Sequence, residues 1–404
     1  MRFSPLVARI TGDGADAWVT HYEALAAAER GEDVIILSVG DPPLDAPQPV
    51  IDRTVELLRA GDTHYTPGPG RDGFREAVAR FHTARTGQPV DASNVVCLPG
   101  TQNALFAASV CLAGADDEVI TFDPVYPTYP ATLEVGGACM LRVPPVAGFR
   151  PDLDALPRLI TARTRAIFWA TPSNPTGVIL SEAELDRIAE LAVRHDLWLV
   201  SDEVYAGLAP GGRVPGLAAR LPGRVVTVGS LSKTHAMAGF RAGWLVGPPA
   251  LARHVEALVR CMLFGMPGFV QEAAVTALGL GDEPQRRIRE FCAARLERFL
   301  AGLDGVPGLL VSRPQAGMFL LIDVSGTGMS GYEFMRALYG AERVSVLDGG
   351  AFGPSTAKFV RVCFATDEHL IEEACARIRR FCGRLPHGNA LGRGITVPGV
   401  RSRE

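Results

Sequence analysis

The chain has 404 residues, 47% of them hydrophobic and 21% charged, and its formal net charge is −4. This length is enough for one large core or for two domains that share an interface. The slight acidic excess excludes a broad basic surface, so we expect no nucleic-acid partner. No apolar run reaches the roughly 18 residues of a membrane helix. The first residues also lack a signal-peptide pattern, so we expect no membrane partner.

The distribution of the cysteines indicates whether the protein works in a reducing or an oxidising compartment. All eight are scattered singly, none forms a C-x-x-C pair, and most lie in apolar segments. Isolated thiols of this kind are typical of a reducing environment, whereas a zinc site needs paired ligands at suitable spacing. We therefore expect a cytoplasmic protein without a metal site.

Four parts are expected along the chain. Residues 1–45, with a strand over 34–40, precede the regular alternation of elements and are expected to join the smaller domain. Residues 46–280 form the large domain and residues 281–385 the small C-terminal domain. Residues 386–404 have little periodicity and are expected to form a tail.

In the large domain, short apolar runs alternate with amphipathic stretches. Strands are expected over residues 94–98, 118–123, 166–172, 197–205, 224–230 and 243–248, with helices over 101–114 and 181–196 among them. Ser181 and Glu184 have the spacing of a capping box, which starts the second of these helices. Apolar strands separated by helices predict an α/β fold with a mostly parallel sheet flanked by helices.

After residue 281 the pattern changes to that of a smaller α+β domain. Helices are expected over residues 283–303, 331–340 and 367–385, and strands over 309–314, 317–324, 344–349 and 358–365. The long first helix is amphipathic, and most of the strands are short and apolar.

Glycine spacing and lysine usage each suggest a chemistry. Gly68, Gly70 and Gly73 match a dinucleotide-binding pattern, but a polar, proline-broken stretch precedes them instead of a buried strand, so we interpret them as a turn. Only two of the 40 basic residues are lysines, Lys233 and Lys358. Arginine replaces lysine as a cation but not as an amine nucleophile. Composition alone leaves amine chemistry and chance retention equally open for either lysine.

Polar side chains follow three successive strands of the expected sheet. Asn174 follows the strand over 166–172, Asp202 and Tyr205 follow the apolar run at 197–200, and Lys233 follows the strand that ends at Ser230. Ligands bind at this edge of open α/β sheets. The set matches a pyridoxal 5′-phosphate (PLP) site, which needs a lysine amine, a carboxylate facing the pyridine nitrogen and donors to the ring oxygen. The phosphate needs cations, hydroxyls and helix N-terminal amides.

In combination these motifs resemble the fold-type I PLP enzymes of aminotransferase class I/II, over roughly residues 1–385. The resemblance implies an aspartate aminotransferase-like fold. It implies that Lys233, in SLSKTHAMAGFRAGW, is the Schiff-base lysine and that Asp202, in SDEVY, faces the pyridinium. Tyr205 and Asn174 would then contact the cofactor oxygen. The implied phosphate ligands are Ser230, Arg241 and the turn Gly100-Thr101-Gln102.

The same resemblance implies further contacts. Tyr126, in DPVYPTYP, takes the position of the aromatic residue that stacks on the cofactor ring. Tyr65, in HYTPGPG, resembles the tyrosine that reaches the phosphate of a neighbouring subunit, so a homodimer is expected. Gly40 and Arg361 resemble the pair that binds the substrate carboxylate, with Asn174 beside them. No second arginine matches the ligand of a distal carboxylate, which argues against aspartate or glutamate as the main donor.

Several stretches resemble the arginine–pyruvate transaminase branch: MRFSPLVARITGDGADAW at the start, the segment around Lys233, CMLFG at 261–265 and VSVLDGGAFGPS at 344–355. This branch implies arginine as donor, or a cyclic arginine relative made for a peptide natural product. Asp13, Asp16 and Trp18 offer carboxylates and an aromatic face to a guanidinium. Helix capping by the two aspartates and core packing by Trp18 are equally open.

The expected activity is therefore transamination between an amino acid and a 2-oxo acid by a ping-pong mechanism. A PLP-dependent lyase or oxidase on the same scaffold is the main alternative, and it would release ammonia instead of transferring the amino group. A non-enzymatic sensor with an aminotransferase-like domain is a remote alternative, because it would need an N-terminal DNA-binding extension.

Overall fold

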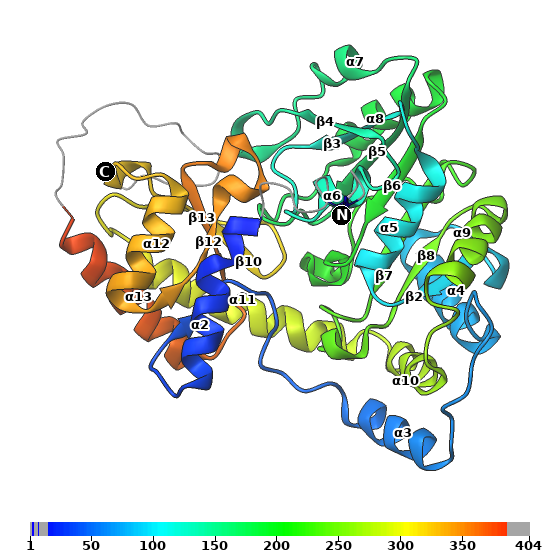
Figure 1. Cartoon of the computed structure of the whole chain (residues 1–404), viewed down its shortest axis with the longest axis horizontal. Helices are drawn as coiled ribbons and strands as arrows, with labels where there is room; N and C mark the ends of the chain where they lie inside the picture. Colours follow the sequence, from blue (N-terminus) through cyan, green and yellow to red (C-terminus); the bar gives the residue numbers. More distant parts are fainter. Residues whose placement is uncertain (1, 4–6, 8–14, 386–404) are drawn as a thin grey trace.

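The computed structural model describes residues 2, 3, 7 and 15–385, with the backbone alone at residues 15 and 16. Within these residues the chain forms a large α/β part and a smaller part with its own sheets (Figure 1). The long helix α11 (Glu283–Leu303) follows the large part in the chain and packs against the last helix, α13 (Glu368–Gly383).

The large part is built on a seven-stranded sheet with the order β2-β8-β7-β6-β5-β3-β4. Its strands are β2 (Val95–Leu98), β3 (Glu118–Phe122), β4 (Cys139–Val143), β5 (Thr164–Ala170), β6 (Trp198–Asp202), β7 (Val225–Ser230) and β8 (Gly243–Val246). The order from β7 to β4 is parallel, whereas β8 runs antiparallel to both of its neighbours.

Helices cover both faces of this sheet, which explains why all six residues of β7 are buried. On one face, α5 (Thr101–Leu112) and α9 (Pro249–Met262) share a hydrophobic cluster with the central strands. On the other, α8 (Glu182–Arg194) packs on β5 and β6, while α4 (Asp72–Thr86) and α10 (Gly268–Gly279) pack on β2 and β8. This arrangement confirms the expected fold class.

The smaller part holds two sheets. A four-stranded antiparallel sheet has the order β12-β13-β10-β9, and a parallel pair joins β1 to β11. The strands are β1 (Ile35–Ile36), β9 (Leu310–Ser312), β10 (Phe319–Asp323), β11 (Val344–Ser345), β12 (Leu347–Asp348) and β13 (Phe359–Cys363). Because β1 pairs with β11, the segment around residue 35 lies with the C-terminal elements, next to α2 (Val19–Glu29) and α12 (Gly331–Glu342).

The remaining elements are short helices and one peripheral helix. They are α3 (Gln48–Arg59), α6 (Tyr129–Leu133), α7 (Leu156–Leu159) and the 3-10 helices η1 (Ala15–Trp18), η2 (Ala92–Asn94), η3 (Ala147–Phe149), η4 (Ala206–Leu208), η5 (Pro210–Gly212), η6 (Ala238–Phe240), η7 (Ser325–Thr327), η8 (Gly349–Phe352) and η9 (Pro354–Thr356). Among residues 15–385, no helix is both long and apolar enough to cross a membrane.

Local signals in the sequence correspond closely to several of these elements. The Ser181 hydroxyl accepts a hydrogen bond from the Glu184 amide, and the Glu184 carboxylate accepts one from the Ser181 amide, so the expected capping box starts α8. Gly68 lies in a turn and Gly73 lies inside α4, with no strand immediately before them. The sequence pattern does not predict β4, a half-exposed edge strand. The strand expected over 34–40 is reduced to two residues.

Candidate active site

Three neighbouring parallel strands end at one edge of the large sheet and bring the expected residues together. β5 ends at Ala170, β6 at Asp202 and β7 at Ser230. A cavity of about 190 Å³ opens there. Nine of the eleven residues assigned to the cofactor by sequence line it: Thr101, Gln102, Tyr126, Asn174, Asp202, Tyr205, Ser230, Lys233 and Arg241.

Asp202 provides a buried carboxylate at the base of this cavity. Its Oδ2 atom accepts a hydrogen bond of 2.9 Å from the Tyr129 hydroxyl, and its Oδ1 atom accepts one of 3.1 Å from the Val204 amide. Burial raises the pKa of Asp202 to about 6, against the lowering effect of these two donors. A carboxylate kept out of water without a cationic partner is suited to face a protonated ring nitrogen.

Tyr129 was not predicted as part of the site. It is fully buried and lies three residues after Tyr126, at the start of the short helix α6. The only signal in the sequence was the second tyrosine in PVYPTYP, whose direction depends on how that loop turns back toward β6.

Lys233 lies three residues beyond the end of β7. Its Nζ atom donates a hydrogen bond of 2.5 Å to the carbonyl oxygen of Gly40, a residue of the N-terminal segment. Burial lowers the pKa of Lys233, and the charge of Asp41 opposes that effect. A lowered pKa favours the neutral amine, which is the nucleophilic form. Asp41 is a second residue near the site that the sequence did not single out.

A cradle for an anion forms where α5 begins. Gly100, with φ of +83°, precedes the helix, whose first residues Thr101 and Gln102 line the cavity. The Thr101 hydroxyl is buried and makes no hydrogen bond within the described part of the chain. Arg241 donates to the carbonyl oxygens of Pro99 at 3.1 Å and Ala238 at 2.8 Å, and it forms no ion pair with a described carboxylate. A Cβ atom on Gly100 would lie 2.4 Å from Arg241 Nη2, so only glycine leaves this cradle open.

Aromatic and amide side chains line the part of the cavity where the cofactor ring is expected. Tyr126 and Tyr205 both line it, and burial raises the pKa of each hydroxyl, so both stay protonated as hydrogen-bond donors. Gln102 was expected to contact the phosphate. It lines the cavity, and its side-chain amide donates to Thr132 at 2.6 Å and accepts from Thr128 at 2.9 Å, which holds the segment after Tyr126 against α5.

Arg361 is a buried cation without a counter-ion. It lies on β13, between β10 and β12, and only 1% of its surface is exposed. Nη1 donates to Asn174 Oδ1 at 3.0 Å and Nη2 to the Ser38 carbonyl at 2.5 Å, while Nε has no partner. No described carboxylate lies within ion-pair distance of it. Because a buried charge needs a partner, this guanidinium is suited to receive a carboxylate from a substrate.

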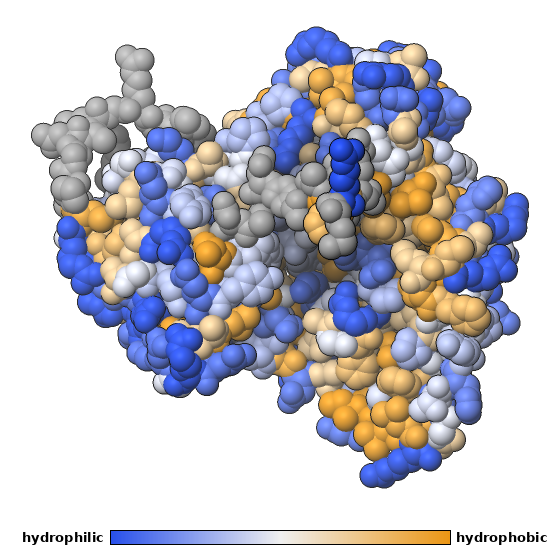
Figure 2. Space-filling model, viewed as in Figure 1, coloured by the Kyte–Doolittle hydropathy of each residue, from blue (hydrophilic) through white to orange (hydrophobic). Residues whose placement is uncertain are grey.

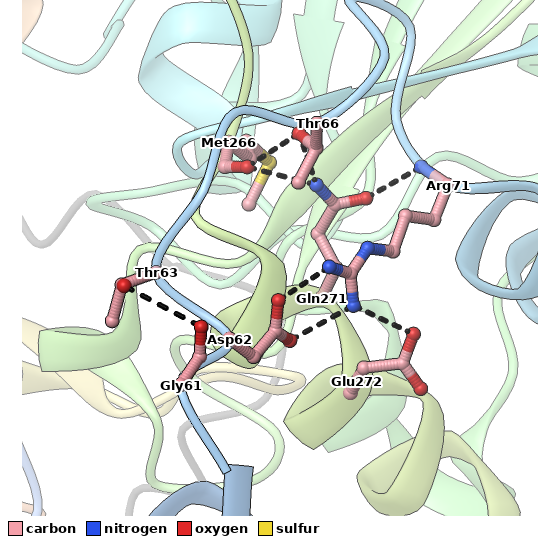
Figure 3. Close-up of polar contacts among 8 residues, drawn as sticks. All are labelled: Gly61, Asp62, Thr63, Thr66, Arg71, Met266, Gln271 and Glu272. Atoms are coloured by element: carbon pink, nitrogen blue, oxygen red, sulfur yellow. Dashed lines mark hydrogen bonds and ion pairs between the residues drawn. The ribbon is translucent and has the colours of Figure 1, made fainter. Parts of the chain in front are cut away.

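Tyr65 lies outside the cavity lining but on an organised segment. Tyr65 is 86% exposed, and its ring packs on Phe264 with the centroids 4.8 Å apart. Figure 3 shows how its loop is held to α10: Arg71 pairs with Asp62 and with Glu272. Gln271 also bonds to Thr66 and to the Arg71 amide. The loop is therefore braced, although the tyrosine itself faces outward.

Trp18 is connected through two intervening residues to Arg361, the residue expected to bind the substrate carboxylate. Its ring meets the edge of His21 at 5.7 Å, and His21 Nδ1 is 2.9 Å from the Ser38 hydroxyl. The carbonyl of that same Ser38 binds Arg361. Asp13 and the side chain of Asp16 lie outside the described residues.

The residues present fit pyridoxal 5′-phosphate. The buried carboxylate of Asp202, the amine of Lys233, the orphaned hydroxyl of Thr101 and the open cradle at Gly100 match the four chemical needs of that cofactor. Within residues 15–385 no cluster of potential ligands is suited to a metal ion.

Comparisons with known proteins agree with this geometry. The family model "Aminotransferase class I and II" matches residues 32–378. The chain is 45% identical to the arginine–pyruvate transaminase of Pseudomonas aeruginosa, over 95% of this chain and 99% of that one. It is 30% identical to an aspartate aminotransferase of Bacillus subtilis, over 94% and 99%.

Solved structures show the same fold. The aspartate aminotransferase of Thermus thermophilus with maleate superposes with a TM-score of 0.88 at 29% identity, covering 94% of this chain and all of that one. The aromatic aminotransferase of Pyrococcus horikoshii gives a TM-score of 0.83 at 29% identity, covering 88% and 98%. With the family model spanning most of the chain and the fold matching throughout, the protein belongs to the class I and II aminotransferases and is a PLP-dependent transaminase.

Proposed function

We propose that this transaminase takes its amino group from a guanidino amino acid, arginine or a cyclic arginine relative, and passes it to a 2-oxo acid. The observation that carries the proposal is the 45% identity, over nearly the whole chain, to a protein named as an arginine–pyruvate transaminase. Identity to the named aspartate aminotransferases is near 30%. A cyclic donor would suit the biosynthesis of a peptide natural product.

Different residues of the site would perform different steps of the reaction. The α-carboxylate of the donor binds the Arg361 guanidinium, with Asn174 beside it. This places the α-carbon toward Lys233, whose amine removes the α-proton and returns it as a general acid. When bound, pyridoxal 5′-phosphate supplies the electrophilic carbon and the electron-withdrawing ring. The donor's product leaves before the acceptor binds, which gives ping-pong order.

The same cavity residues would hold the cofactor. Asp202 would face the ring nitrogen, Tyr126 would stack on the ring, and Tyr205 and Asn174 would donate to its oxygen. Thr101, Ser230, Arg241 and the amides that follow Gly100 would bind the phosphate, while Gln102 would order the adjacent segment.

The guanidinium of the donor is received by the N-terminal segment in this proposal. Trp18 is linked to Arg361 by three contacts, through His21 and Ser38, so its segment borders the substrate end. Asp13 and Asp16 precede it and would pair with the guanidinium, while the Trp18 ring would stack on its plane.

We also propose a cytoplasmic homodimer. Tyr65 is largely exposed on a loop that is braced by ion pairs, as expected for a side chain that reaches into a second subunit. Its partner would be the phosphate cradle of the neighbouring copy.

A donor panel tests this function. Holoenzyme is incubated with pyruvate and equal concentrations of arginine, aspartate or phenylalanine, and both alanine and ammonia are measured. We expect arginine to give the highest kcat/KM, with one alanine formed per donor consumed. Equal rates with aspartate and arginine would contradict the substrate class, and stoichiometric ammonia would indicate a lyase or oxidase.

The acidic recognition site has its own test. Asp13→Asn with Asp16→Asn should reduce the preference for arginine over phenylalanine by about tenfold, the worth of one lost charge-assisted contact. Asp186→Asn with Asp196→Asn, two exposed aspartates of the α8 region, is the matched control. An unaltered preference in the first double variant would exclude these carboxylates from recognition.

A further inference from the structure

A polar cluster joins the large part of the molecule to the smaller part beside the active site. Arg142, on the edge strand β4, donates from one nitrogen to Asp123 Oδ1 at 3.3 Å and to the Phe352 carbonyl at 3.0 Å. The other Asp123 oxygen accepts from the Ser355 amide at 3.2 Å. The Val125 amide also donates to the Phe352 carbonyl, at 2.8 Å. We call Asp123, Arg142 and the segment 352–355 the interdomain clasp.

The clasp leaves no room for another side chain at its centre. Gly353 has φ of +150°, where side chains are rarely accommodated. A Cβ atom there would lie 1.7 Å from Asp123 Oδ1 and 2.8 Å from Arg142 Nη1. Asp123 is itself buried, with 4% of its surface exposed. Arg142 and the Ser355 amide compensate its negative charge. The contact is therefore specific in both sequence and geometry.

On both sides of the interdomain clasp, its residues adjoin residues of the active site. On the large part, Val125 precedes Tyr126, which lines the cofactor cavity. On the smaller part, the Phe352 ring lies 5.1 Å from the Arg361 guanidinium and is fully buried. The second aromatic face on that guanidinium belongs to Phe319, at 4.0 Å. A shift of the segment 352–355 would thus move one of the two rings that hold Arg361.

We propose that Asp123 and Arg142 are positioning residues for the substrate carboxylate. By fixing the Phe352 carbonyl, they hold its ring against Arg361 and keep Arg361 in register with the cofactor side of the cavity. The proposal rests on the carboxylate-binding role of Arg361 proposed above but not on the identity of the donor. Arg142 does not line the cofactor cavity, so its effect would be transmitted through Phe352.

The test compares Arg142→Met with Arg165→Met. Arg165 also pairs with an aspartate, Asp117, but at the opposite end of the neighbouring strands. We expect Arg142→Met to raise KM for both amino acid and 2-oxo acid about tenfold, because misplacement within a site weakens binding to that degree. Turnover should change less than about twofold, cofactor affinity should not change, and Arg165→Met should leave all constants unaltered.

Two further variants keep the result interpretable. Asp123→Asn with Arg142→Gln removes both charges without leaving an unpaired one, so a folding defect of the single variant does not decide the test. Arg361→Met reports on the proposed carboxylate site itself. If Arg361→Met leaves KM unchanged, the assignment of Arg361 fails. If Arg361→Met raises KM but both clasp variants leave it unchanged, the clasp proposal alone is overturned.

Hydrogen exchange provides a readout independent of kinetics. In the clasp variants, amide exchange should rise in residues 349–357 and in 123–126, and it should stay at wild-type levels elsewhere. A uniform rise across the molecule, accompanied by loss of cofactor affinity, would show a general stability defect and contradict a positioning role.

Discussion

Three buried charges at the site lack a partner of opposite charge. Asp202, Lys233 and Arg361 are each largely buried, and none forms an ion pair within the described residues, although ion pairs are common elsewhere on the surface. Folding a charge into a low-dielectric site without a partner is unfavourable. A dianionic, ring-protonated cofactor and a carboxylate substrate supply those partners, so binding should stabilise the fold strongly.

Asp202→Asn should lower the turnover number and, without cofactor, raise the stability of the fold. The variant can accept from only one of Tyr129 and Val204 through its single amide oxygen, and it loses the charge proposed to face the ring nitrogen. We therefore expect kcat to fall about 100-fold or more while substrate KM changes little. An unchanged kcat, measured with saturating cofactor, would exclude this role for Asp202.

Without cofactor, Asp202→Asn should be more stable than wild type at high pH, although it is the less active enzyme. Since burial raises the pKa of Asp202 from 3.8 to about 6, the folded state holds the proton more tightly than the unfolded state. Its contribution to stability is therefore greatest below pH 3.8 and is lost as pH rises through about 6. At pH 8 the Asn variant should be more stable than wild type, by up to about 3 kcal/mol. Urea titration at pH 8 checks this, and a less stable variant would contradict the burial argument.

At the level of elements, the start of α5 shapes the phosphate cradle. Gly100→Ala would place a methyl group against the Arg241 guanidinium in addition to straining a left-handed backbone. We expect its dissociation constant for the cofactor to rise at least about tenfold. Gly87→Ala is the matched control, because Gly87 has φ of +76° at the end of α4 with no atom near its Cβ position.

The control should lose only the cost of the backbone strain, about 1 kcal/mol of stability, with normal cofactor affinity. Absorbance titration of the cofactor and thermal unfolding measure the two effects. Equal cofactor affinity in both variants would mean that the cradle is not where the phosphate binds.

Sequence patterns predicted the elements that carry strong local signals. The starts of α5 and α8 follow from a Gly–Thr turn and a capping box, and β5, β6 and β7 follow from their continuous apolar runs. β4 was missed because an edge strand is half-exposed and its residues, CMLRV, give neither an apolar run nor a clean alternation. The clasp was missed for a different reason, because its contacts with the segment 352–355 join residues more than 200 positions apart.

At the scale of the whole molecule, the site is assembled from distant segments. Arg361 comes from the four-stranded sheet, Asp202 from the large sheet, Asn174 from the turn after β5, and Gly40 from the N-terminal segment. Motifs and a family resemblance placed these residues in one site. They could not show that Lys233 bonds to the Gly40 carbonyl or that the Arg361 guanidinium lies over the rings of Phe319 and Phe352, since packing between segments far apart in the sequence decides both contacts.

The surface also bears on assembly. Apolar side chains gather over the region of α3, α9 and α10, beside the loop that carries Tyr65 (Figure 2). Exposed residues there include Val55, Leu58 and Phe264. An apolar surface around an exposed, braced tyrosine fits an interface between two copies of the chain.

Mixed dimers test that interface. A Tyr65→Ala subunit keeps its own Lys233, and a Lys233→Ala subunit can supply Tyr65 to it. If Tyr65 binds the phosphate of the neighbouring copy, co-refolded mixtures should recover cofactor affinity in a fraction of sites, whereas Tyr65→Ala alone stays weak. Sedimentation of the active species as a monomer, or no recovery in the mixture, would contradict the dimer.

The central claim is that the cavity at the end of β7 performs amine chemistry through Lys233. Two alanine variants test it directly, because the chain contains only one other lysine, the exposed Lys358. Initial rates of arginine-to-pyruvate transfer are measured with both purified proteins at saturating cofactor. Lys233→Ala should fold but lose about 10³-fold or more of its turnover, with Lys358→Ala within about twofold of wild type. An active Lys233→Ala enzyme, or an inactive Lys358→Ala enzyme, would contradict the account.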